Sequence, residues 1–481
     1  MSSSRFRWVF CQLDAIRQCL PSSLRRTLEE LPESLDETYE RIITDIKKGI
    51  WADAYRMLQC LTVAIRPLTV AELAEILALD FDGAKQGIPE LNSNWRWEDH
   101  EQAVLSTCSS LITIVPGHRD PVVQFSHFSV KEFLLSNRLT MSTKDISRFH
   151  IIPEDANALI ASACLGVLLR DPVHLPGYDN GATTAPLARY AAENWVSHAK
   201  VENAASCIRE GVRYLFDPDK PYFAAWVNQY DNYPYAWNPP LKIERLPGAA
   251  PLFYAAFLGF QDIVESLTSK YPQYINAISG EAGTALHSAS HIGHLRIVCS
   301  LLKSGADVDS RGVWNSSPLQ LALTKGHSDV VQCLLDHGAD ANVQDDFYDT
   351  PLTIAAVHGN PEIVRILLHH SADANYQDES GLTPLHRALL YGASKGDYPE
   401  IVRLLLKHGA NPNILDNNHR TPLHLVSSWG LVSLRHEVAH ILLVHGADVG
   451  VEDDEGQTPL QGALASEQLD LVQLLSEYST K

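Results

Sequence analysis

The chain has 481 residues, of which 45% are apolar, and it carries 38 basic against 58 acidic side chains, a formal net charge of -20. This apolar share excludes a chain that is disordered throughout, and the acidic balance argues against a protein that binds the phosphate backbone of nucleic acids. The eight cysteines form no C-x-x-C pair, no secretory signal opens the chain, and its longest apolar stretch, 156–169, is too short to span a membrane. The sequence therefore predicts a reduced cytoplasmic protein without a membrane partner, and the nucleus is the alternative location.

The first residues show apolar side chains at helical spacing. A helical segment is expected over 1–49, with Ser34 as a start signal for its second helix. Two further helices are expected within 54–80. The second of them begins at a capping-box pattern, Thr69 followed three positions later by Glu72.

A hairpin pattern follows these helices. Residues 99–110 continue the helical spacing, 111–115 and 122–125 are apolar β-branched runs separated by a turn, and 129–135 close with a helix. Helices followed by a hairpin and a helix predict a winged-helix-like domain at 50–140.

Residues 141–245 are expected to connect this domain to the C-terminal half. The connector is helical in pattern and contains an aromatic cluster around Phe216 and Trp226. Its end, from Tyr222 onward, is rich in Tyr, Pro and Asn and is expected to be a linker.

A tetrapeptide of the Thr-Pro-Leu-His type recurs through the C-terminal half. Successive copies are 34, 33, 33, 33, 38 and 37 residues apart, and they begin at Ala250, Thr284, Ser317, Thr350, Thr383, Thr421 and Thr458. A period of this length is typical of a solenoid of stacked units. Residues 246–481 also hold 13 basic and 27 acidic side chains, so the array is the more acidic half of the chain.

The physics of one unit is visible in residues 345–377. Thr350 can cap a short helix, and Pro351 occupies the first helical position, where its missing N–H costs nothing. Gly359 can adopt the left-handed conformation that ends this helix. Apolar residues at helical spacing over 363–368 then predict a second, antiparallel helix, which can bury its stripe only against a neighbouring unit.

These residues resemble the ankyrin repeat, whose unit combines such a helix pair with an extended finger. The resemblance covers 246–481 and implies about seven units. Extra residues lie between Ala388 and Ile401 and between Trp429 and Val438, where two enlarged inter-helix loops are expected. The expected fold class is mostly α: a helical and winged-helix-like N-terminal half followed by a C-terminal ankyrin-repeat solenoid.

Three strings of the N-terminal half carry a second resemblance: 31–40, 66–73 and 125–134. They are similar to the helical and winged-helix region that follows the NACHT nucleoside-triphosphatase of filamentous-fungal NOD-like (STAND) proteins. The resemblance implies that 1–49 corresponds to the end of a NACHT module, so that the chain would begin where that ATPase ends. No G-x-x-x-x-G-K-[S/T] loop occurs, so no nucleotide and no other cofactor is expected.

Two motifs could carry catalytic chemistry. His436-Glu437-Val438-Ala439-His440 matches H-E-x-x-H, in which two histidines bind zinc and the glutamate acts as a base. In repeat register, however, 437–439 occupy the ordinary Glu-Ile-Val slot of a second helix. The G-x-S-x-G string at 392–396 falls in an inserted loop, whereas a nucleophile elbow needs a strand before it and a helix after it. Structural interpretations are favoured for both, and no metal site is predicted.

Exposed aromatic side chains mark a more promising surface. Ankyrin proteins bind partners with their finger tips and with the concave face of their first helices, and aromatic residues often anchor interfaces. The register places these candidates on neighbouring fingers: Val313, Trp314, Asp346, Phe347 and Tyr348. It places these on the concave face: His291, His358, Tyr391 and Trp429.

The sequence thus predicts a non-enzymatic scaffold that binds another protein, whose surface is expected to be basic because the array is acidic. Nucleic acid is not expected as a partner. The alternative is the sensing and regulatory part of a fungal NOD-like receptor whose ATPase is missing from this chain. A metal-dependent hydrolase acting through the His436–His440 helix is the third hypothesis.

Overall fold

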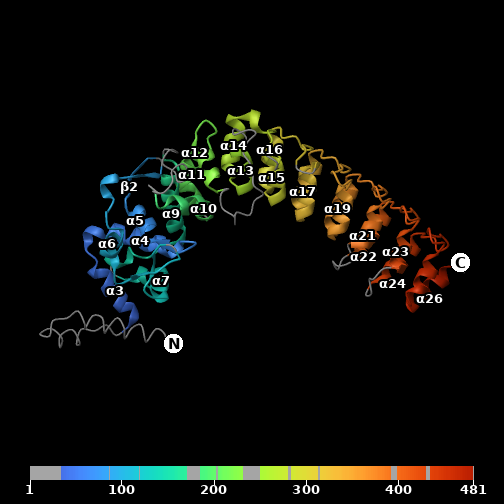
Figure 1. Ribbon diagram of the computed structural model, residues 1–481, viewed down its shortest axis with the longest axis horizontal. Helices are drawn as coiled ribbons and strands as arrows, with labels where there is room; N and C mark the ends of the chain where they lie inside the picture. The colour runs from blue at the N-terminus through green and yellow to red at the C-terminus, as the bar shows by residue number, and fades with distance from the viewer. Residues whose placement is uncertain are drawn as a thin grey trace. The chain divides into compact units, whose positions relative to one another are not determined.

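The computed structural model describes residues 34–85, 87–118, 120–142, 144–170, 185–201, 204–230, 250–279, 283–312, 315–391, 398–428 and 434–479. The chain divides into two compact units, Met1–Asn238 and Pro239–Lys481. Helices dominate both, as the sequence predicts (Figure 1). Within the described residues, no helix has both the length and the apolar character that a membrane crossing requires.

The first described helix, α3 (Leu35–Asp45), begins at the predicted position. Ser34 is its N-cap, and the Ser34 hydroxyl accepts the backbone N–H of Glu37 at 3.2 Å. The stripe of α3 buries Tyr39 and Ile43 almost completely. The earlier part of the predicted helical segment, residues 1–33, lies outside the described residues.

A winged-helix domain follows, which confirms the prediction. Its three strands form one antiparallel sheet in the order β1-β5-β4. Val123 lies opposite Leu68 on one side and Ile114 on the other, and it is buried where helices pack against the sheet. The domain is built from α4 (Trp51–Val63), β1 (Leu68–Thr69), α5 (Val70–Leu77), α6 (His100–Cys108), β4 (Ile112–Val115), β5 (Val122–Phe125) and α7 (Phe128–Leu135).

The predicted capping box starts α5. The Thr69 hydroxyl accepts the N–H of Glu72 at 3.2 Å, and the Glu72 carboxylate accepts the N–H of Thr69 at 2.8 Å. The carboxylate of Glu72 also binds the guanidinium of Arg66 at 2.6 Å. Two orphan N–H groups are thereby satisfied at the point where the chain passes from β1 into the helix.

A second hairpin between α5 and α6 was not predicted. It consists of β2 (Leu79–Lys85) and β3 (Ile88–Leu91), and a short 3-10 turn, η2 (Ser93–Trp95), follows it. Leu79 to Asp82 alternate apolar and polar residues, but the alternation stops at Gly83, whose N–H donates to the Asp80 carboxylate at 2.8 Å. The pairing of β2 with β3 also shifts register between Asp80 and Lys85, so the regular alternation extends over only four residues.

Helices complete the first unit: η1 (Lys48–Ile50), η3 (Leu139–Met141), α8 (Lys144–Ser147), α9 (Pro153–Leu168), α10 (Ala188–Ala199), α11 (Ala204–Leu215) and α12 (Tyr222–Tyr230). The longest apolar stretch of the sequence is α9, which is buried because α4, α10 and α11 pack around it. The predicted aromatic cluster is present. Trp226 of α12 contacts Trp195 and Phe216 and donates its indole N–H to the carbonyl of Ala192, so α12 belongs to this unit and is not a linker.

One buried acid ties the winged-helix domain to these helices. The carboxylate of Glu75 on α5 is 2% exposed and accepts hydrogen bonds from Arg96 at 3.1 Å and Arg170 at 2.8 Å. Its second oxygen accepts the backbone N–H of Leu187 at 2.7 Å. A buried carboxylate is tolerable here because two guanidinium groups and an amide compensate for its lost hydration.

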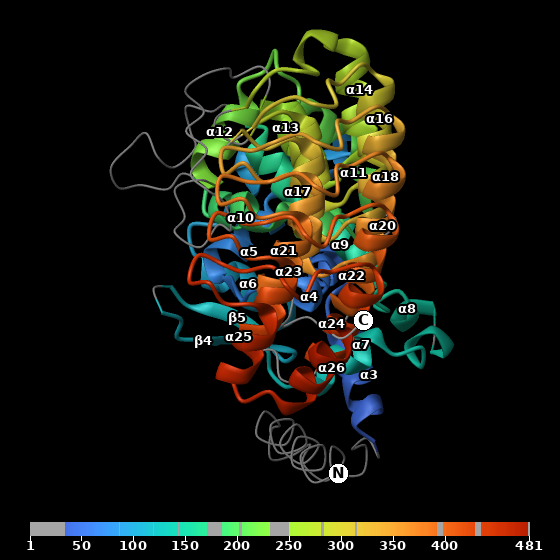
Figure 2. The ribbon, with the colours of Figure 1, turned by 90° about the vertical axis from the view of Figure 1, so that its right-hand side faces the viewer.

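The second unit is an array of helix pairs stacked side by side (Figure 1). Seen along the array, α16, α18, α20 and α22 form one column, and α17, α21 and α23 form another (Figure 2). The first helices of the pairs are α13 (Ala250–Leu258), α15 (Ala285–Ile292), α17 (Pro318–Lys325), α19 (Pro351–His358), α21 (Pro384–Tyr391), α23 (Pro422–Ser428) and α25 (Pro459–Ala465). The second helices are α14 (Gln261–Lys270), α16 (Leu295–Lys303), α18 (Ser328–Asp336), α20 (Pro361–His369), α22 (Tyr398–Lys407), α24 (Arg435–Val444) and α26 (Leu469–Ser479).

The start and stop signals of the unit at 345–377 act as the sequence predicts. The Thr350 hydroxyl accepts the N–H of Thr353 at 3.3 Å, Pro351 is the first residue of α19, and Gly359 ends the helix with a φ of 74°. The second helix, α20, buries the predicted stripe at Ile363 and Leu367.

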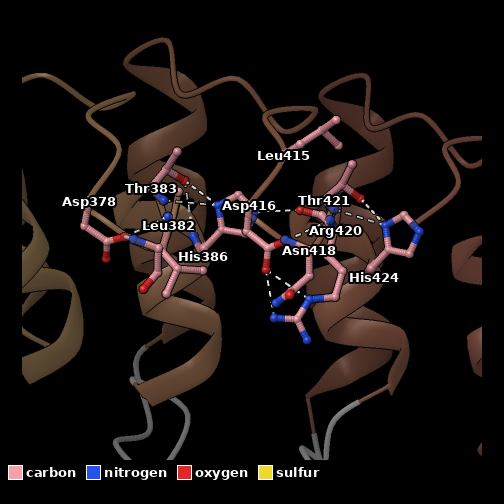
Figure 3. A network of polar contacts seen from close by, with 12 residues as sticks. Asp378, Leu382, Thr383, His386, Leu415, Asp416, Asn418, Arg420, Thr421 and His424 are labelled. Carbon is pink, nitrogen blue, oxygen red and sulfur yellow. Dashed lines mark hydrogen bonds and ion pairs between the residues drawn. The ribbon is translucent and has the colours of Figure 1, made fainter. Parts of the chain in front are cut away.

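The fourth residue of the tetrapeptide joins consecutive units (Figure 3). His386 accepts the N–H of Thr383 on Nδ1 at 3.2 Å, and its Nε2 donates to the carbonyl of Arg420 in the next unit at 3.2 Å. Gln320 makes the equivalent pair of bonds. Its amide oxygen accepts the N–H of Ser317, and its amide nitrogen donates to the backbone carbonyl of Asp349 in the next unit. The histidines of the tetrapeptide are therefore structural, as the repeat register predicts.

Candidate functional site

From residue 345 onward, the described fingers end in turns that an aspartate organises. In the turn at 345–349, the carboxylate of Asp345 accepts the N–H of Phe347 at 2.9 Å and the N–H of Asp349 at 3.0 Å. The equivalent carboxylates that make this pair of bonds are Asp378, Asp416 and Asp453. These aspartates are structural, so their charge is not what distinguishes one finger from another.

The fourth residue of each turn has a left-handed backbone. Gly381 and Gly456 occupy this position in two turns, with φ of 73° and 69°, and glycine adopts that conformation without strain. In three other turns the residue is not glycine: it is Asn315, Tyr348 and His419, with φ of 56°, 59° and 53°. A tyrosine at such a position carries a steric cost that glycine does not.

The tip of this finger is also the most aromatic exposed surface of the described array. Phe347 is 63% exposed and Tyr348 is 45% exposed, and Asp346 beside them is exposed as well. The structure therefore places these three predicted residues together on one turn, in positions from which they can contact a partner.

An acidic cluster lies at the base of this finger and the next. The Arg387 guanidinium of α21 binds Asp378 at 2.6 Å and lies 3.5 Å from Asp349. Burial raises the pKa of the Asp349 carboxyl, which Arg387 only partly offsets. Asp349 Oδ1 is buried and is the atom that faces Arg387 in this ion pair, so it is not open to a partner.

Tyr376 belongs to the same cluster. Partial burial raises the pKa of its phenol, and the nearby charges of Asp378, Asp349 and Glu379 raise it further. Sequence reasoning missed both Tyr376 and Arg387. In repeat register Tyr376 replaces the aliphatic residues Val343 and Ile414, and this exchange is the signal that could have revealed it.

The predicted concave-face residues lie at the ends of the first helices. Tyr391 ends α21, is 54% exposed, and has the guanidinium of Arg387 5.6 Å from its ring centre. Arg387 thus connects Tyr391 to the finger base. His358 ends α19 and bonds its own helix through the carbonyl of Ile354. His291 lies on α15 and is separated from α19 by α17, so the structure does not bring it to the finger at 345–349.

Three predicted site residues, Val313, Trp314 and Trp429, lie outside the described residues. So do the two inserted loops that the sequence predicts and the G-x-S-x-G string within the first of them. Their assignments remain predictions from the repeat register.

The H-E-x-x-H string is described and lies on α24. Its glutamate, Glu437, forms an ion pair with Arg403 of the preceding second helix, and His436 and His440 are exposed. Over the described part of the chain, no group of three or more His, Cys, Asp or Glu side chains is arranged to hold a metal ion. Nothing in the geometry of α24 favours hydrolysis.

Comparison with protein families agrees with this architecture. Residues 319–416 and 389–481 match the family of ankyrin repeats in three copies, and residues 283–313 match the single ankyrin repeat. The C-terminal unit is an ankyrin-repeat domain. Residues 39–145 match the winged helix domain of GPI inositol-deacylase, which overlaps the winged-helix domain described above.

Curated relatives share parts of the chain. It is 32% identical over 297 residues to the azaphilone pigments biosynthesis cluster protein L of Monascus ruber, a match that covers 58% of this chain and 61% of that protein. It is 38% identical over 79 residues to alpha-latrocrustotoxin-Lt1a of Latrodectus tredecimguttatus, covering 16% of this chain and 6% of the toxin. The chain therefore spans less than two thirds of each of these relatives.

Solved ankyrin structures also resemble the array. The ankyrin repeat domain of Bcl-3, a member of the IkappaB family, is 26% identical with a TM-score of 0.43, and the match covers 47% of this chain and 97% of that one. An ankyrin repeat domain from Acinetobacter baumannii AYE is 32% identical with a TM-score of 0.39, covering 41% of this chain and 98% of that one.

Proposed function

We propose that this protein is a non-enzymatic scaffold that binds a partner protein through its ankyrin array, and that the binding surface is centred on the finger tip at 345–349. The observation that carries the proposal is the left-handed backbone of Tyr348 beside the exposed ring of Phe347. The fold itself would be better served by glycine at position 348, as in the turns that hold Gly381 and Gly456. An exposed aromatic pair kept at a cost to stability is typical of an interface anchor.

The charge of the surface favours a partner with lysine or arginine side chains. Asp346 and Glu379 are exposed on the two neighbouring fingers. A partner cation beside Asp346 or Glu379 would gain a charge-assisted hydrogen bond, and a ring such as that of Tyr348 can add a cation–π contact. The proposed partner segment is therefore basic, as the net charge of the array also suggests.

The proposal is tested by affinity capture with the full chain as bait, compared with a Phe347→Ser/Tyr348→Gly double variant. The matched control is Glu455→Ser, which changes the equivalent tip position of a later finger. Partners lost with the double variant and retained by the control identify the surface. Binding of the recovered partner should also weaken as salt rises, because its attraction is partly electrostatic.

If the same partners bind the wild type and the double variant equally, the finger tip is not the binding surface. If the double variant loses the partner but binding to the wild type does not depend on salt, the partner is recognised by its apolar surface. The proposal of a basic partner segment is then wrong.

The alternative function is the sensing and regulatory part of a NOD-like receptor. The match of residues 39–145 to a winged helix domain, followed in the same chain by ankyrin repeats, supports it. Sequencing the full transcript from its source tests this alternative. A P-loop encoded in frame would favour the receptor, and a transcript without one would leave the scaffold as the function.

A further inference from the structure

Two cysteines of neighbouring repeats meet on the second-helix side of the array. The Sγ atoms of Cys299 on α16 and Cys333 on α18 are 2.8 Å apart, and both thiols are free. This separation is closer than sulfur atoms normally approach without a bond or a shared proton. A small rotation of either side chain therefore brings the two atoms within bonding distance.

The position of Cys299 is unusual for a cysteine. In repeat register its place is taken in later units by Arg365 and Arg403, whose side chains are 54% and 46% exposed. Cys299 is likewise only partly buried, whereas Cys60 and Cys164 are completely enclosed in the first unit. Cysteine is among the most buried residue types, and one placed where other units have a solvated arginine is open to soluble reagents.

The geometry points to a site of reversible thiol oxidation: we propose that Cys299 and Cys333 form a disulfide that staples the unit of α15 and α16 to the unit of α17 and α18. The oxidant belongs to the class of hydroperoxides. The staple would close a loop of about 34 residues, which falls in the range where cross-links restrict the unfolded chain appreciably.

The chemistry balances in two steps. In the first step the Cys299 thiolate attacks the terminal (hydroxyl) oxygen of the hydroperoxide. A sulfur–oxygen bond forms, the oxygen–oxygen bond breaks, and water or an alcohol leaves. Cys333 sulfur then attacks the sulfur of the Cys299 sulfenic acid. The sulfur–sulfur bond forms, the sulfur–oxygen bond breaks, and hydroxide leaves as water with the proton of Cys333. The two thiols supply the two electrons that reduce the peroxide.

The surroundings fit this division of roles. Cys299 is the more exposed of the two and receives the oxidant. Burial, and then the hydrogen bond and charge of Cys299, raise the pKa of Cys333 to about 12. Once Cys299 becomes a neutral sulfenic acid, the repulsion from its charge disappears, and Cys333 can lose its proton during the attack.

The test exposes the full chain to hydrogen peroxide, blocks the remaining thiols, and maps non-reduced peptides by mass spectrometry. We expect most molecules to yield one cross-linked peptide that joins Cys299 to Cys333. Dithiothreitol should remove this cross-link. The oxidised chain should also show an unfolding transition of the array raised by about 5 °C or more relative to the reduced chain. Cys299→Ser should abolish both effects.

A geometric control keeps the number of thiols. In Gln332→Cys/Cys333→Ser the second thiol moves to the position of α18 that is equivalent to Cys299 on α16. Equivalent positions on packed neighbouring helices are about 8–10 Å apart, which is too far for a disulfide. No cross-link is expected in this variant. If the wild type yields only sulfinic acid at Cys299, or if the displaced thiol cross-links as readily, the proposal is overturned.

Discussion

The side chain of Asn342 holds the backbone of Asp373, one repeat further along the chain. Asn342 Oδ1 accepts the N–H of Asp373 at 2.7 Å, and Asn342 Nδ2 donates to the carbonyl of Ser371 at 3.3 Å. Asn375 and Asn413 make the same two bonds to their own following units. A ladder of amide side chains thus keeps consecutive fingers in register, including the two fingers that bear the proposed binding surface.

We expect Asn342→Ala to lower the unfolding free energy of the array by about 1 kcal/mol, since both bonds are lost and the partners can turn to water. Asn342→Asp should lower the unfolding free energy by less than Asn342→Ala does. It keeps the acceptor, as Asp309 does for the N–H of Asp340 at 3.0 Å. Urea unfolding of the two variants measures the difference. Equal losses in both would mean that the oxygen of Asn342 contributes nothing to the ladder.

Tyr348→Gly should stabilise the array by about 1 kcal/mol, because glycine adopts a positive φ without the steric cost that Tyr348 bears. The reverse change, Gly456→Tyr, should destabilise it by a similar amount. No heavy atom lies within 4 Å of a Cβ placed at Gly456, so the effect would come from the backbone alone. Thermal unfolding of both variants tests this pair. A destabilising Tyr348→Gly would show that Tyr348 packs for stability, and would remove the support that strain gives to the proposed function.

Acid should destabilise the array between pH 6.5 and pH 4. Burial lowers the pKa of His287 from 6.5 to about 4, so in this interval the unfolded chain binds a proton that the folded chain does not. The stabilisation is complete above pH 6.5 and is lost as the pH falls towards 4. Burial also lowers the pKa values of His386 and His424, which adds to the same slope.

Gln320 provides the control for this titration, because its amide makes the bonds of the histidine without ionising. His287→Gln should therefore flatten the pH dependence of the unfolding free energy, by about 3 kcal/mol at most near pH 4. Gln320→His should make it steeper. Urea titrations at several pH values decide between these outcomes, and an unchanged slope in both variants would place the acid sensitivity elsewhere.

In the first unit, Glu75→Ala should cost about 3 kcal/mol, because Arg170 would keep a largely buried charge without its partner. Replacing both residues, as in Glu75→Met/Arg170→Met, should recover part of the loss, since the more buried charge of Arg170 is removed and Arg96, whose side chain is 41% exposed, can turn to water. Calorimetry of the full chain follows the two units as separate transitions if they unfold independently. A double variant that is worse than Glu75→Ala would contradict this account.

The units of the array could be predicted because their signals are local. Thr350, Pro351 and Gly359 fix where one helix starts and stops through their own backbone preferences. The strand β1 could not be predicted in the same way. Leu68 and Thr69 are extended because they pair with Val123 and Val122, more than fifty residues later, and two residues show no periodicity.

The candidate site, too, could be predicted only where the signals are local. Phe347 and Tyr348 could be placed on a finger tip from the repeat register alone. The strain at Tyr348 required its φ angle, and the part played by Arg387 required knowing that its side chain reaches from α21 to Asp378 and Asp349. Contacts between units depend on side-chain reach, which a single sequence does not reveal.

The short range of the bonds between units has a consequence for synthesis. Asn342 and Asp373 are 31 residues apart, and His386 and Arg420 are 34 residues apart, so each bond closes as soon as one further unit has emerged. A growing chain can then add finished units in order, and no early segment has to wait for a distant partner. Folding in such an array can start at any well-capped unit and spread to its neighbours.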